Sequence, residues 1–153
     1  MKNILDLLVE QPIFAELNPK QMSVIATHCH IKTFQKDEII FNEGEVGDAL
    51  YYIMDGIVKV LKRVGEGHNI VVAKILPGHF VGEMALLDRT CRSASVQATE
   101  ETTTLMIETS HFDAILKSDA QVAFLLMRSI AKIISDQLRQ TTMKLATTQL
   151  VID

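Results

Sequence analysis

The sequence predicts a mainly β fold with flanking helices (α+β). We expect an antiparallel β-roll, or jelly-roll barrel, with a short inserted helix and a long C-terminal helix. All seven glycines of the 153 residues fall within residues 44–82. Short apolar runs alternate there with turn residues, as in an antiparallel roll or barrel. Beyond residue 118 there is neither glycine nor proline, which favours one continuous helix.

The first part of the chain, residues 1–118, is expected to contain a helical lead-in and the roll. Asn18-Pro19 is a plausible N-cap and first turn for a helix through about His28. In the glycine-rich region Asp55-Gly56 suits a tight turn that needs a positive φ. The roll therefore begins after a short helix and is built from strands joined by turns.

Two further helix starts follow the roll. Ser110 with Asp113, and Ser118 with Gln121, have the spacing of a capping box. The remaining residues 119–153 are expected to form a lid and dimerisation helix of roughly 50 Å, at ~1.5 Å per residue.

One face of this helix predicts self-association. Its apolar residues recur with the alternating 4,3 spacing of a two-helix seam. They are Met127, Ala131, Ile134, Leu138, Thr141, Leu145, Thr148 and Ile152. The alternative is packing on the chain's own sheet through Val122, Leu126, Ile130 and Ile133, and both arrangements can hold on different faces.

Composition excludes several classes of protein. The net charge is −4 with no basic run, so we expect no direct nucleic-acid binding, which needs a clustered cationic face. No apolar run approaches the ~18 residues of a membrane span. Two cysteines give no disulfide framework and favour a reducing, cytoplasmic location.

The chemistry is concentrated in residues 78–96. Gly82 removes a side chain where a ligand could approach the backbone, and a helical turn begins near Glu83. Free first-turn amides form an anion site, and Arg92, returning on the next strand, could offer its planar fork to the same anion. Glu83 would suit hydroxyl donors such as those of a sugar. The alternative is a surface ion pair between Glu83 and Arg92.

This segment resembles the phosphate-binding cassette of the cyclic nucleotide-binding domain family. The motifs are Gly82-Glu83-Met84-Ala85-Leu86 and Arg92-Ser93-Ala94-Ser95-Val96. Upstream motifs of the roll agree, among them Phe41-Asn42-Glu43-Gly44 and Pro77-Gly78-His79-Phe80. The resemblance runs from about Pro12 to the C-terminus, and it makes the inserted turn a phosphate-binding helix.

The resemblance implies specific roles. Arg92 would pair with the cyclic phosphate and Glu83 would accept from the ribose 2′-hydroxyl, while Arg89 is a rival for the phosphate. The other implied ligand-binding residues form the cassette or an apolar wall. They are Gly82, Met84, Ala85, Ser93 and Ala94 in the cassette, and Val60, Val72 and Ala73 in the wall.

The last helix resembles the dimerising helix of bacterial catabolite activator proteins over Leu138–Leu145. The resemblance implies that Thr141 and Thr142 contact the base, which favours cAMP over cGMP. Two solvated threonines are the alternative. Gln137 departs from the arginine of that family. A DNA-reading helix-turn-helix would begin near Asp153, so we expect either a sensor acting through an unidentified partner or a trimmed output domain.

Two other classes of protein are alternatives. An enzyme of the cupin kind would need histidines and a carboxylate converging on a metal. His28 and His30, two apart on a predicted helix, would not share a face, so we expect no metal, no cofactor and no catalytic residue. The second alternative is a protein-interaction module of the same fold that does not bind cyclic nucleotide.

Overall fold

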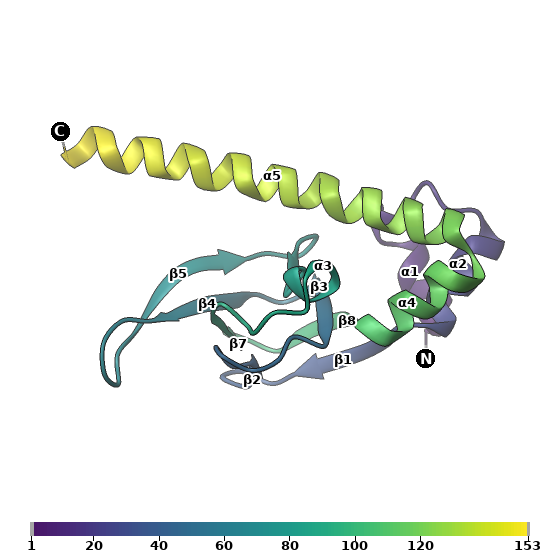
Figure 1. Ribbon diagram of the computed structural model, residues 1–153, viewed down its shortest axis with the longest axis horizontal. Helices are drawn as coiled ribbons and strands as arrows, with labels where there is room; N and C mark the ends of the chain where they lie inside the picture. Colours follow the sequence, from purple (N-terminus) through teal and green to yellow (C-terminus); the bar gives the residue numbers. More distant parts are fainter. Residues whose placement is uncertain (1, 153) are drawn as a thin grey trace.

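The computed structural model describes residues 2–152 and places two four-stranded antiparallel sheets beside a long helix (Figure 1). The order is β1-β8-β3-β6 in the first sheet and β2-β7-β4-β5 in the second. The strands are β1 (His30–Phe34), β2 (Ile39–Phe41), β3 (Ala49–Asp55), β4 (Val58–Arg63), β5 (Asn69–Ile75), β6 (Phe80–Val81), β7 (Ser95–Ala98) and β8 (Thr102–Glu108). The predicted antiparallel roll is confirmed.

Strand β3 separates two hydrophobic cores. Successive side chains of a strand point to opposite faces. Leu50 and Tyr52 therefore pack against the helices, while Tyr51 and Ile53 pack between the two sheets. A strand with both faces buried explains the almost uninterrupted apolar run at this point in the sequence.

The predicted turn at Asp55-Gly56 joins β3 to β4. Gly56 has a φ of +88°, and a Cβ on it would lie 2.5 Å from the Thr102 Oγ1. No other residue type is accommodated there without a shift of β8, because both the conformation and the space are restricted.

The helices lie outside the sheets, apart from one in the cassette. They are α1 (Ile4–Val9), the 3₁₀ turn η1 (Pro12–Phe14), α2 (Pro19–Thr27), α3 (Met84–Leu87), α4 (Thr109–Ser118) and α5 (Ala120–Ile152). Asn18 caps α2 as predicted: its side chain accepts from the Gln21 N–H at 2.9 Å, and the Gln21 side chain accepts from the Asn18 N–H at 3.0 Å.

The predicted N-caps of the last two helices were wrong, by two residues for α4 and by one residue for α5. Helix α4 begins at Thr109 after Glu108, so Ser110 lies inside it. Ser118 ends α4, and the Asp119 carboxylate accepts from the Val122 N–H at 3.1 Å at the start of α5. A carboxylate is as effective a cap as a serine hydroxyl, and the capping-box spacing cannot distinguish neighbouring polar residues.

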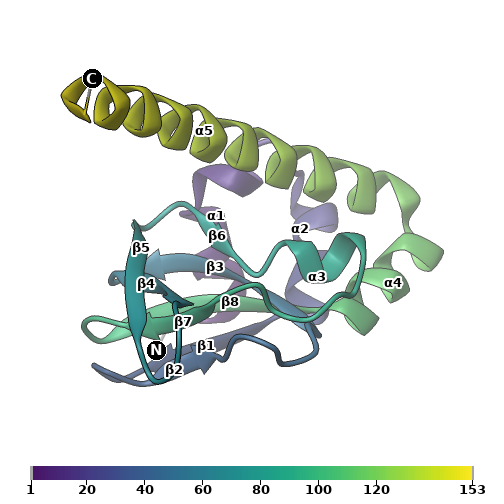
Figure 2. The same cartoon turned by 60° about the vertical axis from the view of Figure 1, so that its left-hand side comes forward.

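Helix α5 is continuous, as predicted, and runs over α3 and the roll (Figures 1 and 2). Its first half is buried through Val122, Leu126 and Ile130. Its second half is exposed, with Leu138 65% and Leu145 66% accessible. Packing on the chain's own sheet thus accounts for one face, and the predicted seam is uncovered beyond Ile134. None of the helices in residues 2–152 is long and apolar enough to cross a membrane.

Candidate ligand-binding site

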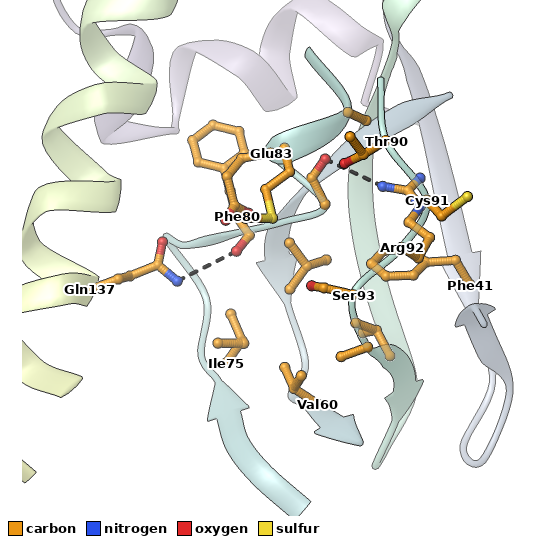
Figure 3. Close-up of a pocket in the computed structure, with 16 residues that line it drawn as sticks. Phe41, Val60, Ile75, Phe80, Glu83, Thr90, Cys91, Arg92, Ser93 and Gln137 are labelled. Carbon is orange, nitrogen blue, oxygen red and sulfur yellow. Dashed lines mark hydrogen bonds between the residues drawn. The ribbon is translucent and has the colours of Figure 1, made fainter. Parts of the chain in front are cut away.

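A cavity of about 630 Å³, counting the space open to solvent, lies between the cassette around α3, the second sheet and α5 (Figure 3). Its lining residues are Phe41, Val60, Ile75, Phe80, Val81, Gly82, Glu83, Met84, Ala85, Thr90, Cys91, Arg92, Ser93, Ala94, Val96 and Gln137. Most are apolar, and Glu83 and Arg92 are the charged residues among them.

The cassette starts where β6 ends. Gly82 has a φ of +76°, which turns the chain sharply into α3, and half-buried Glu83 precedes the helix without capping it through its side chain. The Ala85 N–H donates to the Gly82 carbonyl at 3.2 Å, and the Leu86 N–H donates to the Glu83 carbonyl at 3.1 Å. These two first-turn amides are already used, contrary to the expectation of free donors.

Arg92 is buried, with 7% of the residue exposed. Its Nη2 donates to the Ala49 carbonyl at 2.7 Å, and its Nη1 donates to the Gly82 carbonyl at 3.3 Å. The guanidinium carbon lies 4.0 Å from the centre of the Phe41 ring, a cation–π arrangement. Arg92 precedes β7 rather than lying within a strand, so its predicted place on the next strand was wrong.

The charge of Arg92 is poorly compensated. Within residues 2–152 its Nε is buried and has no hydrogen-bond partner. Its nearest carboxylate, Asp48, lies 3.7 Å from Nη2 and is itself 87% exposed. Burial lowers the pKa of the Arg92 guanidinium, and the neighbouring Tyr51 and Asp48 act in the opposite direction. Because an arginine keeps its proton in proteins, this arrangement is a buried cation that an anion would stabilise.

The bend after α3 is fixed by its own side chains. The Asp88 carboxylate accepts from the Thr90 N–H at 3.1 Å and from its hydroxyl at 2.8 Å, and these bonds lower the pKa of Asp88. Arg89, the rival for the phosphate, pairs instead with Asp113 on α4 and is absent from the cavity lining. The structure thus leaves Arg92 as the arginine that faces the cavity.

The segment after Arg92 is held by a lysine. Lys62 donates to the Ser93 carbonyl at 2.7 Å and pairs with Glu43 at 2.6 Å, which lowers the pKa of Glu43. The Ser95 hydroxyl accepts from the Glu43 N–H at 2.8 Å. Ser93 is exposed at the cavity wall, so its hydroxyl is accessible to a bound molecule.

The structure gathers most of the predicted site residues at this cavity. Those in its lining are Val60, Gly82, Glu83, Met84, Ala85, Arg92, Ser93 and Ala94. Val72 and Ala73 on β5 are not among the lining residues, and Val72 is 53% exposed. Val72 lies at a bulge in the pairing of β4 with β5, because Val60 is opposite Ala73 and Leu61 is opposite Val71. Ile75, two residues beyond Ala73, is the residue of β5 in the lining.

Thr141 and Thr142 also lie outside the lining. Both are exposed, and their hydroxyls donate to the carbonyls of Gln137 at 3.0 Å and Leu138 at 2.9 Å, one helical turn earlier. The contact between α5 and the cavity is made by Gln137, whose Nε2 donates to the Phe80 carbonyl at 3.5 Å (Figure 3). The contact of Thr141 and Thr142 with a base stays a prediction.

Sequence reasoning left several lining residues out of the site. Phe41, Phe80 and Val96 occur in the motifs of the roll, and Gln137 was noted only as a departure. For Phe41, Phe80 and Val96, their places in those motifs were the available signal. Ile75 and Cys91 carried no signal of their own.

Comparison with known proteins agrees with this geometry. Residues 31–119 match the model of the cyclic nucleotide-binding domain. The cyclic AMP receptor protein of Thermus thermophilus is 28% identical over 134 residues, which are 88% of this chain and 60% of that protein. The potassium/sodium hyperpolarization-activated cyclic nucleotide-gated channel 3 of Mus musculus is also 28% identical over 134 residues, but these are only 16% of the channel.

A solved structure shows the same fold. A cyclic nucleotide-binding domain from Methylobacillus flagellatus superposes with a TM-score of 0.82 at 20% identity, covering 95% of this chain and 82% of that one. The roll, the cassette and the matched residues together define a β-roll domain of the cassette-containing class. The chain belongs to the cyclic nucleotide-binding domain family.

Proposed function

We propose that the chain is a regulatory sensor, not an enzyme, that binds a cyclic nucleotide in the cavity, with cAMP favoured over cGMP. The observation that supports this most is the buried guanidinium of Arg92, which lines the cavity and whose Nε has no hydrogen-bond partner among the described residues. A cyclic phosphate is a compact anion whose two free oxygens suit a planar fork. A bound cyclic phosphate would compensate the positive charge of Arg92, which the protein side chains do not.

The rest of the cavity agrees with a phosphoribose and a base. Glu83 is a half-buried acceptor in the same lining and suits the ribose 2′-hydroxyl. Val60 and Ile75 provide an apolar wall on which a base could lie. The preference for cAMP rests on the likeness to the receptor protein of Thermus thermophilus, whose name specifies cyclic AMP.

Helix α5 would act as the lid. Thr141 lies one turn beyond Gln137 on the same face of α5, so a shift of the helix toward the cavity would bring its hydroxyl to the ligand. A ligand that contacts the closed position better shifts the equilibrium toward it by that difference in affinity. We propose that this movement, in a homodimer joined through α5, transmits the signal to a protein partner. A cytoplasmic location and no direct nucleic-acid binding belong to the same proposal.

Calorimetric titration with cAMP and with cGMP tests the proposal. We expect low-micromolar binding of cAMP and weaker binding of cGMP. Arg92→Ala should lose about 2 to 5 kcal/mol of binding free energy, because it removes one member of a desolvated charge pair. Arg92→Lys should restore only part of it, since a lysine keeps the charge but not the fork.

Two controls separate binding from folding. Arg63→Ala removes an exposed arginine of β4 outside the cavity and should bind as the wild type does. Circular dichroism of each Arg92 variant should show the wild-type fold. If the folded wild type binds neither nucleotide, the protein is instead an interaction module of the same fold.

A further inference from the structure

Three side chains that ligate metals meet at one end of the first sheet, away from the ligand cavity. His30 is the first residue of β1, Glu108 is the last residue of β8, and His111 lies in the first turn of α4. One ring nitrogen of each histidine and one carboxylate oxygen lie within 4.8 Å of one another. None of the three lines the cavity.

The fold itself brings them together. In the antiparallel pairing of β1 and β8, His30 lies opposite Met106. Glu108 is two residues beyond Met106, so it shares a face with His30 as a diagonal neighbour. His111 follows Glu108 by three residues as the chain enters α4, a spacing that places both side chains on one side of the first turn. Figure 2 shows the start of β1 and the end of β8 beside α4.

A second observation points to a ligand at this place. The Nδ1 of His111 is buried and has no hydrogen-bond partner within residues 2–152. The nearest carboxylate oxygen, on Glu108, is 3.6 Å away, which is too long for a hydrogen bond. An unsatisfied buried nitrogen destabilises the folded state. The ring of His30 lies 5.4 Å from that of His111, centre to centre, and does not satisfy this atom either.

We propose that His30, Glu108 and His111 form a Zn²⁺ site with a fourth position open to water. Two imidazoles and one carboxylate are a donor set found in zinc sites with an open position. They suit Zn²⁺ better than the hard cations Mg²⁺ and Ca²⁺, which prefer oxygen ligands. This site is independent of the proposed nucleotide site.

The geometry requires only a local adjustment. Tetrahedral ligands at about 2.1 Å from zinc are about 3.4 Å from one another, so the three donor atoms must approach by roughly 1.4 Å or less from their separation of within 4.8 Å. His30 is exposed, which gives the ion access and leaves the ring free to rotate. A bound ion would link β1 to the start of α4. Because it would bind only the folded state, it would stabilise that state, and more so as its occupancy increases.

Calorimetric titration of EDTA-treated protein with ZnCl₂ tests the site, with the Cys91→Ser substitution in every sample so that the exposed thiol does not bind the ion. We expect one Zn²⁺ per chain, a Zn²⁺-dependent rise in melting temperature, and no such rise with MgCl₂. His30→Ala and His111→Ala should each weaken zinc binding at least ten-fold. His68→Ala, an exposed histidine of the β4–β5 turn, is the matched control and should bind as the parent does.

The His30→Ala variant separates loss of zinc binding from loss of the fold. His30 is exposed, so its removal should leave the fold intact, and circular dichroism checks this. Failure of the parent protein to bind one Zn²⁺ overturns the proposal, as does equal zinc affinity in the His30→Ala, His111→Ala and His68→Ala proteins.

Discussion

The Nη1 of Arg92 lies where a side chain on Gly82 would have to be. A Cβ added at Gly82 would be 2.5 Å from that nitrogen, and also 3.2 Å from the Ala49 carbonyl oxygen. The absence of a side chain at Gly82 therefore leaves the space that the Arg92 guanidinium occupies. The Nη1 of that guanidinium donates to the Gly82 carbonyl at 3.3 Å, and its Nη2 donates to the Ala49 carbonyl at 2.7 Å.

Gly82→Ala should therefore displace Arg92 and weaken cAMP binding more than ten-fold. Because Gly82 has a positive φ, the substitution should also lower the free energy of unfolding by roughly 1 to 2 kcal/mol. Gly65→Ala is the matched control, because Gly65 has a φ of +70° but no heavy atom of the described chain within 4 Å of the added Cβ. Both variants are measured by chemical denaturation and by calorimetric titration.

Comparing Gly82→Ala with Gly65→Ala isolates the effect of the contact between the added Cβ and Arg92. Gly65→Ala should show only the cost of the backbone conformation and wild-type affinity for cAMP. Equal losses of stability, with affinity unchanged in Gly82→Ala, would contradict a role for this glycine in positioning Arg92.

The proposed role of Glu83 is tested by changing protein and ligand together. Glu83→Ala and 2′-deoxy-cAMP each remove one partner of the same proposed hydrogen bond. Their combined effect should then fall short of the sum by about 1.5 to 3 kcal/mol, the net value of a hydrogen bond to a charged group. Titration of wild type and variant with both ligands gives the four affinities.

A distant carboxylate provides the control for this cycle. Glu66→Ala, in the exposed β4–β5 turn, should give additive effects with 2′-deoxy-cAMP. Additive effects in the Glu83→Ala cycle as well would show that Glu83 does not accept a hydrogen bond from the 2′-hydroxyl.

The roll could be predicted because local signals and global packing agree within it. Gly56 marks the turn by its positive φ, and the run at β3 is apolar because both of its faces are buried. The cassette was located by residues whose spacing is short and continuous along the chain. Its part of the cavity lining followed from that motif, except for Thr90 and Cys91, which lie in the bend between its two halves.

Other features depend on distances between elements, which spacing along the chain does not contain. Whether Ala73 or Ile75 reaches the cavity depends on side-chain length and on the bulge between Val60 and Leu61 in the pairing of β4 with β5. His28 and His30 were placed on one helix, but His28 ends α2 and His30 begins β1. The approach of His30 to His111 arises from strand pairing across more than 70 residues.

The two cysteines should differ in reactivity, and one should report ligand binding. Burial raises the pKa of the Cys29 thiol to about 12, so it has almost no thiolate at pH 8. Its raised pKa also means that its contribution to folding stability is complete below the unfolded-state pKa and is lost as the pH rises toward 12. Cys91 is exposed and lines the cavity.

Alkylation by iodoacetamide at pH 8, followed by mass spectrometry, should thus modify Cys91 and leave Cys29 intact. Saturating cAMP should slow the modification of Cys91 several-fold in the wild type. It should not do so in Arg92→Ala at the same cAMP concentration. A rate at Cys91 that is unchanged by bound cAMP would place the ligand away from this wall of the cavity.

The exposed second half of α5 predicts a dimer that a single charge can dissociate. Leu138 and Leu145 are 65% and 66% exposed and belong to the 4,3 pattern, so a second copy of the helix would cover both. Burying one leucine is worth roughly 1.5 to 3 kcal/mol, and each substitution occurs twice in a symmetric pair. Leu145→Lys should therefore raise the dimer dissociation constant by at least 100-fold in sedimentation equilibrium. Leu150→Lys introduces the same charge at a position that is 80% exposed and lies off the pattern, so it should remain dimeric. A monomeric wild type, or dissociation by both substitutions alike, would contradict pairing through this face of α5.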